Sequence, residues 1–350
     1  MSFNMNERRE KILRLIIDHY IDSGVPVSSR AMCSQYRLDL CPASVRNVMA
    51  DLEELGLITH LHTSAGRVPT DKGYRFYVDR LLASIGLTHQ EQDEINQEFL
   101  ARQLALEEVM RKTSRVLSTV THYAAVVSLP EVKRSAFKRI QFMPLGSRHF
   151  CVTLITNTGA TKSAVIHFDL DIDIDMLQRI ENFMNSQLAD TPLHQLKTKL
   201  RRMMIQERHS FFYLLQQAID LIDLTALIDE HTSLYFEGIG NMLCLPEFAN
   251  GPAVLDFVRT LDDRDSFGKF LDELVNEDEE PQRVRVVIGG ERNQSVLRQC
   301  ALVVSDYRVH DRAVGALGII GPKRMNYGRA IATVRYMSDL LSRTLSQFSV

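Results

Sequence analysis

The segment PASVRNVMADLEELGLITHLHTSAGRVPTDKGYRFYVD, from Pro42 to Asp79, decides the fold of the N-terminal part of the chain. Its first half has apolar residues at helical spacing, and Pro42 suits the first position of a helix. After Gly56 the pattern alternates as a strand does, TSAG can reverse the chain, and RVP starts a return strand. Thr70 then caps another helix. The segment therefore predicts a helix, a hairpin and a second helix.

Two more helices are expected before this segment. Apolar residues recur at helical spacing over about residues 6–22, and Gly24 supplies a stop. Ser28 is a natural N-cap for a short helix that ends near Tyr36. Three helices, a hairpin and a helix are the order of a winged helix-turn-helix, in which two short helices meet at a turn and a β-ribbon follows. We therefore expect residues 1–80 to form a winged-helix DNA-binding domain.

The polar side chains of this domain are suited to two kinds of DNA contact. The third helix carries polar residues near its N-terminus, where recognition helices read base edges. Arginine can bind guanine and asparagine can bind adenine in the major groove, while small or cationic groups can bind phosphate. We expect base readout by Ser44, Arg46 and Asn47. The expected contacts with the DNA backbone come from Thr63, Ser64, Arg67, Lys72 and Arg75.

Other interpretations of residues 1–80 stay open. Eleven Lys and Arg stand against ten Asp and Glu, so the domain is barely basic. A winged helix can also bind protein instead of nucleic acid. His60 and His62 face the same side of a strand and could be a metal pair, but no third ligand lies nearby in the sequence. We therefore expect no metal site here.

Two motifs, PASVRNVMADLEELGLI and HTSAGRVPTDKGYRFYVD, resemble the signature of the bacterial heat-inducible transcription repressors that control chaperone operons. The resemblance covers most of residues 5–80. It implies a dimeric repressor that binds an inverted repeat upstream of chaperone genes and needs a GroE-type chaperonin for its active fold. One residue departs from the family pattern, because Cys41 stands where the family usually has a serine. A thiol is a weaker helix cap than a hydroxyl.

Beyond residue 80 the sequence predicts an α+β multi-domain protein. A polar, glutamine-rich stretch indicates a helical linker over 81–104. Strand-like segments in 105–173 and 235–350 flank a helical block, so we expect one α+β domain in two segments, interrupted by an all-helical insertion at 174–234. The family resemblance implies that these parts are a GAF-like domain and an inserted dimerisation domain.

Composition places the chain among globular proteins. It has 350 residues, of which 45% are hydrophobic and 24% charged, and its net charge of -3 requires any nucleic-acid-binding face to be local. No signal-peptide pattern and no apolar run of membrane-spanning length occur, so we expect a cytoplasmic location. The five scattered cysteines contain no C-x-x-C pair, which disfavours a zinc cluster. No catalytic motif is found, so we expect neither enzymatic activity nor a cofactor.

Three other segments have weaker functional interpretations. DLDIDID at 169–175 lacks the glycine and glutamate of a calcium loop, and GALGIIGPK at 315–323 lacks the spacing of a phosphate loop. The acidic segment 262–280 is typical of a solvated helix but could bind a protein. Two alternatives therefore stay open: a winged-helix repressor that senses a small molecule in the GAF-like domain, and a winged-helix adaptor that does not bind DNA.

Overall fold

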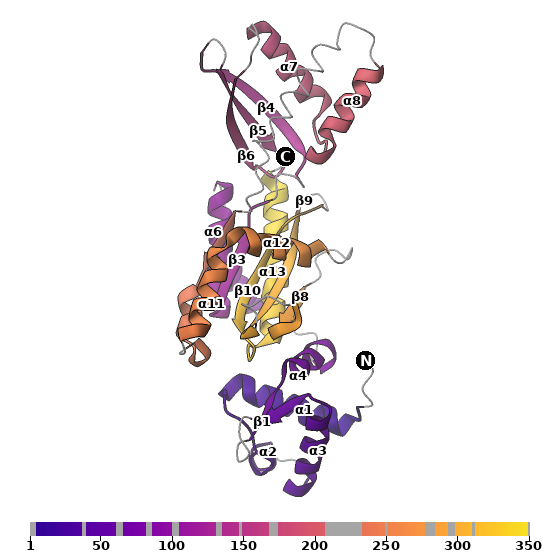
Figure 1. The fold of residues 1–350 in the computed structure, drawn as a ribbon, viewed down its shortest axis with the longest axis vertical. Helices are drawn as coiled ribbons and strands as arrows, with labels where there is room; N and C mark the ends of the chain where they lie inside the picture. The colour runs from indigo at the N-terminus through magenta and orange to yellow at the C-terminus, as the bar shows by residue number, and fades with distance from the viewer. Residues whose placement is uncertain are drawn as a thin grey trace.

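The computed structural model describes residues 5–36, 40–60, 66–81, 86–99, 105–130, 135–146, 149–167, 174–206, 233–248, 251–276, 284–292, 298–309 and 312–348. These segments form three bodies along the molecule, with a central five-stranded sheet between an N-terminal helical unit and a smaller three-stranded unit (Figure 1). The chain is thus a mixed α/β protein.

The N-terminal unit has the predicted order of elements. Its helices and strands are α1 (Glu7–Ser23), α2 (Ser29–Gln35), α3 (Pro42–Glu54), β1 (Ile58–His60), β2 (Arg67–Pro69) and α4 (Asp71–Phe76), followed by a π-helical turn (Tyr77–Leu81). Two predicted caps are confirmed, because the hydroxyl of Ser28 accepts a hydrogen bond from the Ala31 N–H and that of Thr70 from the Gly73 N–H. The antiparallel pair β1–β2 forms the predicted hairpin.

The core of the N-terminal unit uses one face of each helix. Ile12, Ile16 and Ile17 from α1 meet Val45 and Leu52 from α3, and all five are almost fully buried. Ile12 and Ile16 are four residues apart and Val45 and Leu52 are seven apart, which are spacings that place side chains on one face of a helix. The opposite face of α3 consequently remains on the surface.

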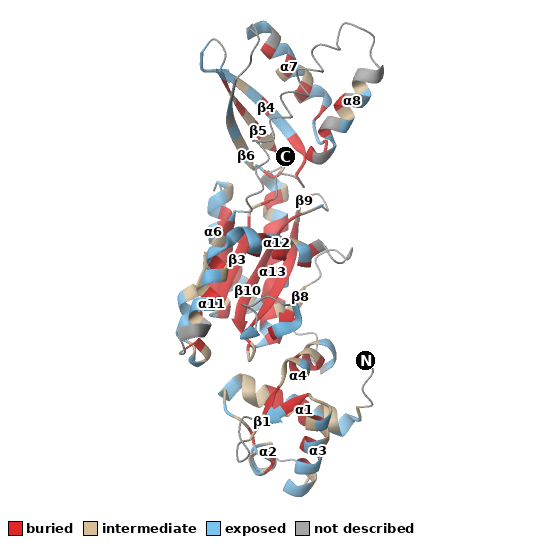
Figure 2. Cartoon of the chain, in the orientation of Figure 1, coloured by how far each residue is buried: buried red, intermediate tan, exposed pale blue. Residues whose placement is uncertain are grey.

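The central sheet has the strand order β7-β3-β10-β9-β8, and every neighbouring pair is antiparallel. The strands are β3 (Ala124–Ser128), β7 (Leu234–Glu237), β8 (Arg285–Ile288), β9 (Cys300–Val309) and β10 (Arg312–Pro322). Helices α6 (Leu106–Thr121) and α13 (Tyr327–Phe348) cover one face, and α11 (Gly251–Asp262) and α12 (Arg264–Asn276) cover the other. Figure 2 shows that the sheet between these helices is buried. Helix α5 (His89–Phe99) packs against α6.

The smaller unit combines three strands with helices. Strands β4 (Phe137–Pro144), β5 (His149–Thr156) and β6 (Thr161–His167) pair in this order. Helices α7 (Ile174–Gln187) and α8 (Leu196–Gln206), separated by the 3-10 turn Leu193–Gln195, cover one sheet face. The shared core includes Phe137, Ile140, Phe150, Val152, Leu177, Ile180, Met184 and Leu200.

The extent of this unit differs from the sequence prediction. We expected strands of 137–167 in the domain of 105–173 and an all-helical insertion at 174–234. Instead these strands form their own sheet under α7 and α8, outside the central sheet. The chain leaves the central sheet after β3 and returns at β7, where the Leu129 N–H donates to the Ser233 carbonyl at 2.9 Å. Strand periodicity does not reveal which sheet a strand joins.

The segments with weaker functional interpretations have ordinary structural roles where the structure describes them. Residues 315–322 belong to the buried strand β10, and much of 262–280 forms α12. Most of 169–175 lies outside the described residues. Within the described ranges no helix is long and apolar enough to cross a membrane, and no three His, Cys, Asp or Glu residues are grouped to hold a metal.

Candidate nucleic-acid interface

The exposed front of α3 carries the three residues predicted to read bases. Arg46 and Asn47 are exposed and Ser44 is half-buried, all in the first two turns. Cys41, at the N-cap, makes no capping hydrogen bond to the backbone. Its thiol lies 3.2 Å from the Ser44 hydroxyl, and this hydrogen bond lowers the pKa of Cys41. The helix start is therefore held by Pro42 and by packing, without the usual hydroxyl cap.

Two of the three carboxylates of α3, Asp51 and Glu53, are paired with cations from other elements, and the third, Glu54, is exposed at the last residue of the helix. Asp51 accepts hydrogen bonds from Arg9, with the Nη2–Oδ2 distance at 2.7 Å. Glu53 contacts both strands of the hairpin, at 2.8 Å from Arg67 Nη2 and 2.5 Å from His60 Nδ1. Paired carboxylates repel a phosphate chain less than free ones do. Arg46 is the one charged residue in the first two turns of the helix, Pro42 to Met49, so the front of α3 carries a positive charge.

The base of the hairpin is attached to the loop before α2. Val27 and Arg67 exchange backbone hydrogen bonds of 3.1 and 2.9 Å. Gly66 allows this close approach, since a Cβ atom there would lie 2.7 Å from backbone atoms of Pro26 and Val27. The base of the hairpin is thus attached to the loop before α2, and the ion pair between Arg67 and Glu53 joins it to α3. The predicted phosphate contacts Thr63 and Ser64 lie outside the described residues.

The two predicted cations of α4 have different surroundings. Lys72 is exposed, and its Nζ donates to the Leu55 carbonyl at the end of α3 at 2.9 Å. Arg75 faces the central body instead, where its guanidinium binds Glu291 through two hydrogen bonds of 2.8 and 2.5 Å. These bonds raise the pKa of Arg75. The structure therefore brings Lys72 to the end of α3 and directs Arg75 away from its front.

One cation beside the site was not singled out from the sequence. Arg30 is exposed on α2, the helix that packs against α3. In helix-turn-helix proteins the helix before the recognition helix crosses the DNA backbone. The sequence signal was a cation in the first turn of this short helix.

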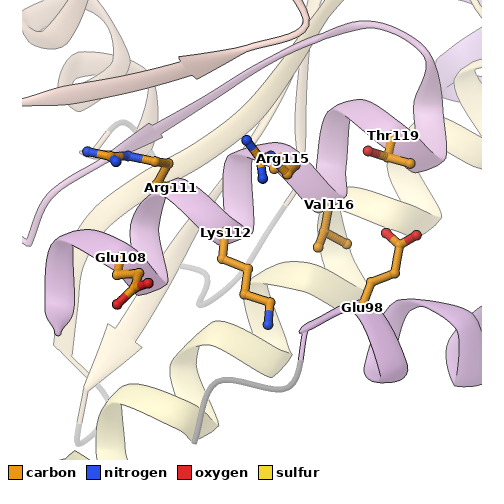
Figure 3. A pocket seen from close by; sticks show the side chains of 7 residues that line it. All are labelled: Glu98, Glu108, Arg111, Lys112, Arg115, Val116 and Thr119. Atoms are coloured by element: carbon orange, nitrogen blue, oxygen red, sulfur yellow. The ribbon is translucent and has the colours of Figure 1, made fainter. Parts of the chain in front are cut away.

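A second cationic surface lies on the central body, between α5 and α6. Its groove, of about 550 Å³, is lined by Glu98, Glu108, Arg111, Lys112, Arg115, Val116 and Thr119 (Figure 3). Figure 3 shows two carboxylates among the three cations. The mixed charge distinguishes this groove from the first two turns of α3, which contain no carboxylate.

Known proteins resemble this chain over nearly its full length. A family model described as the HrcA protein C terminal domain matches residues 107–331. The heat-inducible transcription repressor HrcA of Geobacter sulfurreducens is 36% identical over 342 residues, which cover 98% of each chain. That of Syntrophobacter fumaroxidans is 33% identical over 345 residues, again with 98% of each chain covered. A crystal structure of a hypothetical protein shares the fold, with a TM-score of 0.65, 23% identity and coverage of 99% of this chain and 100% of that chain.

The protein is a transcription repressor. Its class is defined by its near-full-length relatives, which are repressors, and it carries an exposed cationic helix front on a multi-domain α/β body. Both the family model and the near-full-length relatives identify one group. The chain belongs to the HrcA family of heat-inducible transcription repressors. The resemblance inferred from two N-terminal motifs is thereby confirmed, and it extends through the C-terminal two thirds of the chain.

Proposed function

We propose that the N-terminal unit is a winged helix-turn-helix that places α3 in the major groove of a duplex operator. Ser44, Arg46 and Asn47 read base edges there. Thr63, Ser64, Arg67 and Lys72 contact the phosphates, with Arg30 on the preceding helix. The observation that supports this assignment is the exposure of Arg46 and Asn47 on a helix whose Asp51 and Glu53 are paired.

The proposed operator is an inverted repeat bound by a dimer. A twofold dimer presents two α3 helices, so it matches a palindromic duplex whose half-sites lie on one face. Contacts with phosphates release counterions, which makes binding strongly dependent on salt. Bound at a promoter, the dimer blocks polymerase by occupancy.

We assign the other bodies by the same proposal. Residues 81–104 connect the DNA-binding domain to a GAF-like domain built on the central sheet. The smaller unit is the dimerisation domain, and the membership of β4–β6 moves the start of this insertion from residue 174 to about residue 131. The chain enters this unit after Leu129 and leaves it before Ser233, and these two residues are joined by a backbone hydrogen bond.

This assignment is tested by excising residues 131–232 and joining the ends with a short glycine-serine linker. Because β3 and β7 are neighbours, the central sheet can keep its pairing. The expected result is a folded monomer in sedimentation, with binding to an isolated half-site retained. A dimer of the excised chain would place the dimer contact elsewhere.

The proposed regulation links repression to a GroE-type chaperonin, as the family resemblance implies. Heat diverts the chaperonin to unfolded clients, the repressor loses its active fold, and chaperone genes are transcribed. Small free-energy changes shift the active fraction of a marginally stable chain strongly. Purified chaperonin with ATP should increase the fraction of freshly refolded repressor that binds its operator; no increase would contradict this part of the proposal.

The central experiment recovers fragments of genomic DNA bound by the purified protein. The expected fragments share an inverted repeat beside chaperone genes. An Arg46→Ala protein, used in parallel, should recover fragments with a relaxed preference at one position of each half-site. Recovery of fragments without a common motif by the unmodified protein would contradict sequence-specific repression.

The two alternatives weighed from the sequence have less support. Aromatic rings occupy the sheet face under α11 and α12, where centroids of Phe248 and Phe257 are 5.3 Å apart and those of Phe236 and Phe267 are 5.9 Å apart. This packing favours a structural core over a small-molecule site. Relatives named as repressors favour DNA binding over an adaptor role.

A further inference from the structure

Helix α4 joins the N-terminal unit to the central body through charged contacts. Besides its two hydrogen bonds to Glu291, Arg75 donates to the Val286 carbonyl at 2.5 Å. Both carboxylate oxygens of Glu291 therefore face one guanidinium, and the side chains are each about 30% exposed. Bidentate pairs of this kind restrict rotation as well as distance.

A second charged contact is made at the start of the same helix. Asp71 lies 2.6 Å from Lys323 Nζ, and its carboxylate also accepts from the Gly290 N–H at 3.4 Å. Gly289 has a φ of +56°, and a Cβ atom there would lie 2.1 Å from the Asp71 carboxylate. Asp71 and Arg75 are four residues apart, so one turn of α4 is held at both ends.

Aromatic packing fills the space between these charged contacts. Tyr74 and Tyr327 are almost fully buried, and their ring centroids are 5.8 Å apart. Burial raises the pKa of both hydroxyl groups. The Tyr327 hydroxyl donates to the Lys323 carbonyl at 2.7 Å, which connects the aromatic contact to the ion pair.

A further contact reaches the end of α1. Gly24 caps this helix in the left-handed conformation, and a Cβ atom there would lie 3.5 Å from the Arg324 guanidinium. Arg324 is oriented by Glu247, with which it forms an ion pair. A cation near a helix C-terminus interacts favourably with the helix dipole. The central body therefore approaches the N-terminal unit at a second element, the end of α1, in addition to α4.

We propose that these contacts determine which half-site spacing the repressor accepts. We call Asp71, Tyr74, Arg75, Glu291, Lys323 and Tyr327 the α4 clasp. With the clasp closed, the direction of α3 is set by the central body, and in a dimer the two α3 helices have one separation. The clasp residues are positioning residues for operator recognition. This inference rests on the proposed function.

The geometry of DNA makes spacing a sensitive readout. Half-sites repeat on one face about every 10–10.5 base pairs, so five inserted base pairs turn one half-site to the opposite face. If the two N-terminal units of a dimer are fixed, the second unit then loses its contact with the second half-site. Loosely tethered N-terminal units can instead follow the rotation of the half-site. Loss of the second, intramolecular contact is worth about 100-fold or more in affinity.

The test uses a variant that changes the clasp from the central body alone. Glu291→Gln with Lys323→Gln removes one partner of each ion pair, leaves the N-terminal unit unchanged and conserves the net charge. The matched control is Lys269→Gln with Glu273→Gln, two exposed residues one turn apart on α12. Full-length proteins are titrated with three duplexes: the inverted repeat recovered from genomic DNA, the same repeat with five inserted base pairs, and an isolated half-site.

The expected result is a change in a ratio of affinities, which does not depend on the fraction of active protein. For the unmodified protein and the control, the insertion should lower affinity by about 100-fold. For the clasp variant it should lower affinity by less than about tenfold, with half-site affinity unchanged. Arg75→Lys, which retains the charge but loses the bidentate geometry, should give an intermediate ratio.

Other outcomes have distinct meanings. A clasp variant with the spacing preference of the unmodified protein would overturn the inference while leaving the proposed function intact. A clasp variant that binds the recovered repeat more tightly than the unmodified protein would also overturn it, since the clasp would then hold α3 away from DNA. Failure of the unmodified protein to prefer the repeat over the half-site would remove the proposed function and the inference together.

Discussion

Helices α3 and α4 each carry an arginine that the sequence assigns to DNA, but the structure gives these two arginines opposite surroundings. Arg46 of α3 is exposed, and Asp51 and Glu53 farther along that helix are paired with Arg9 and Arg67. Arg75 of α4 is bound by Glu291, a residue 216 positions away in the sequence. A cation that the sequence assigns to DNA can therefore instead bind a carboxylate that folding brings from a distant part of the chain.

The largest expected effect is a difference in the free energy of unfolding between substitutions on the buried and the exposed face of α3. Leu52 is fully buried on the packing face, so Leu52→Ala should lower the free energy of unfolding of the N-terminal unit by about 2–5 kcal/mol. Asn47→Ala, on the exposed face, should change it by less than about 0.5 kcal/mol. Denaturant unfolding of both variants measures the difference; equal losses would show that the exposed face also contributes to packing.

The next effect compares the two arginines directly. Arg46→Ala should weaken operator binding by about 1–3 kcal/mol and relax the preference at one base position. Arg75→Ala should leave base preference unchanged, because its guanidinium faces Glu291 and the Val286 carbonyl. Binding to operators substituted one position at a time distinguishes the variants. An altered base preference in Arg75→Ala would contradict the contrast between the helices.

A smaller effect concerns the hairpin. Arg67→Ala should weaken binding almost equally on specific and scrambled duplexes, and the slope of log affinity against log salt should fall by about 1. Glu53 would also lose its partner and repel the phosphates. Titrations at several salt concentrations test this. A loss confined to the specific duplex would make Arg67 a base-reading residue.

The smallest expected effect lies at the start of α3. Cys41 makes no capping hydrogen bond, so Cys41→Ser should stabilise the N-terminal unit by about 0.5–1 kcal/mol. Cys41→Ala, which also lacks a capping hydroxyl, is the matched control and should leave stability nearly unchanged. Thermal unfolding measures both. Destabilisation by serine would mean that the contact between the Cys41 thiol and the Ser44 hydroxyl holds the helix start.

Local chemistry made the N-terminal unit predictable from the sequence. Ser28 and Thr70 cap their helices as expected, and the apolar stripe of α3 is buried. Caps and amphipathic stripes act within a few residues, so they are visible in one short segment. The exposure of Arg46 and Asn47 follows from the same stripe, because they lie on the other side of the helix.

Partners distant in the sequence could not be read in this way. The strands of 137–167 have the alternation of a half-buried sheet, but only tertiary packing places them under α7 and α8 instead of beside β3. The engagement of Arg75 likewise depends on where Glu291 lies after folding.

The sequence by itself determined the family, the N-terminal helices and hairpin, and the polar front of α3. The tertiary structure alone decided that the strands after residue 105 divide into two sheets. It also decided that Asp51 pairs with Arg9 and Glu53 with Arg67, and that α4 is attached to the central body. The physical reason is the distance along the sequence over which each interaction acts. Helix caps and periodic apolar faces are local free-energy terms, whereas sheet membership and ion pairing depend on which distant segments the whole fold brings together.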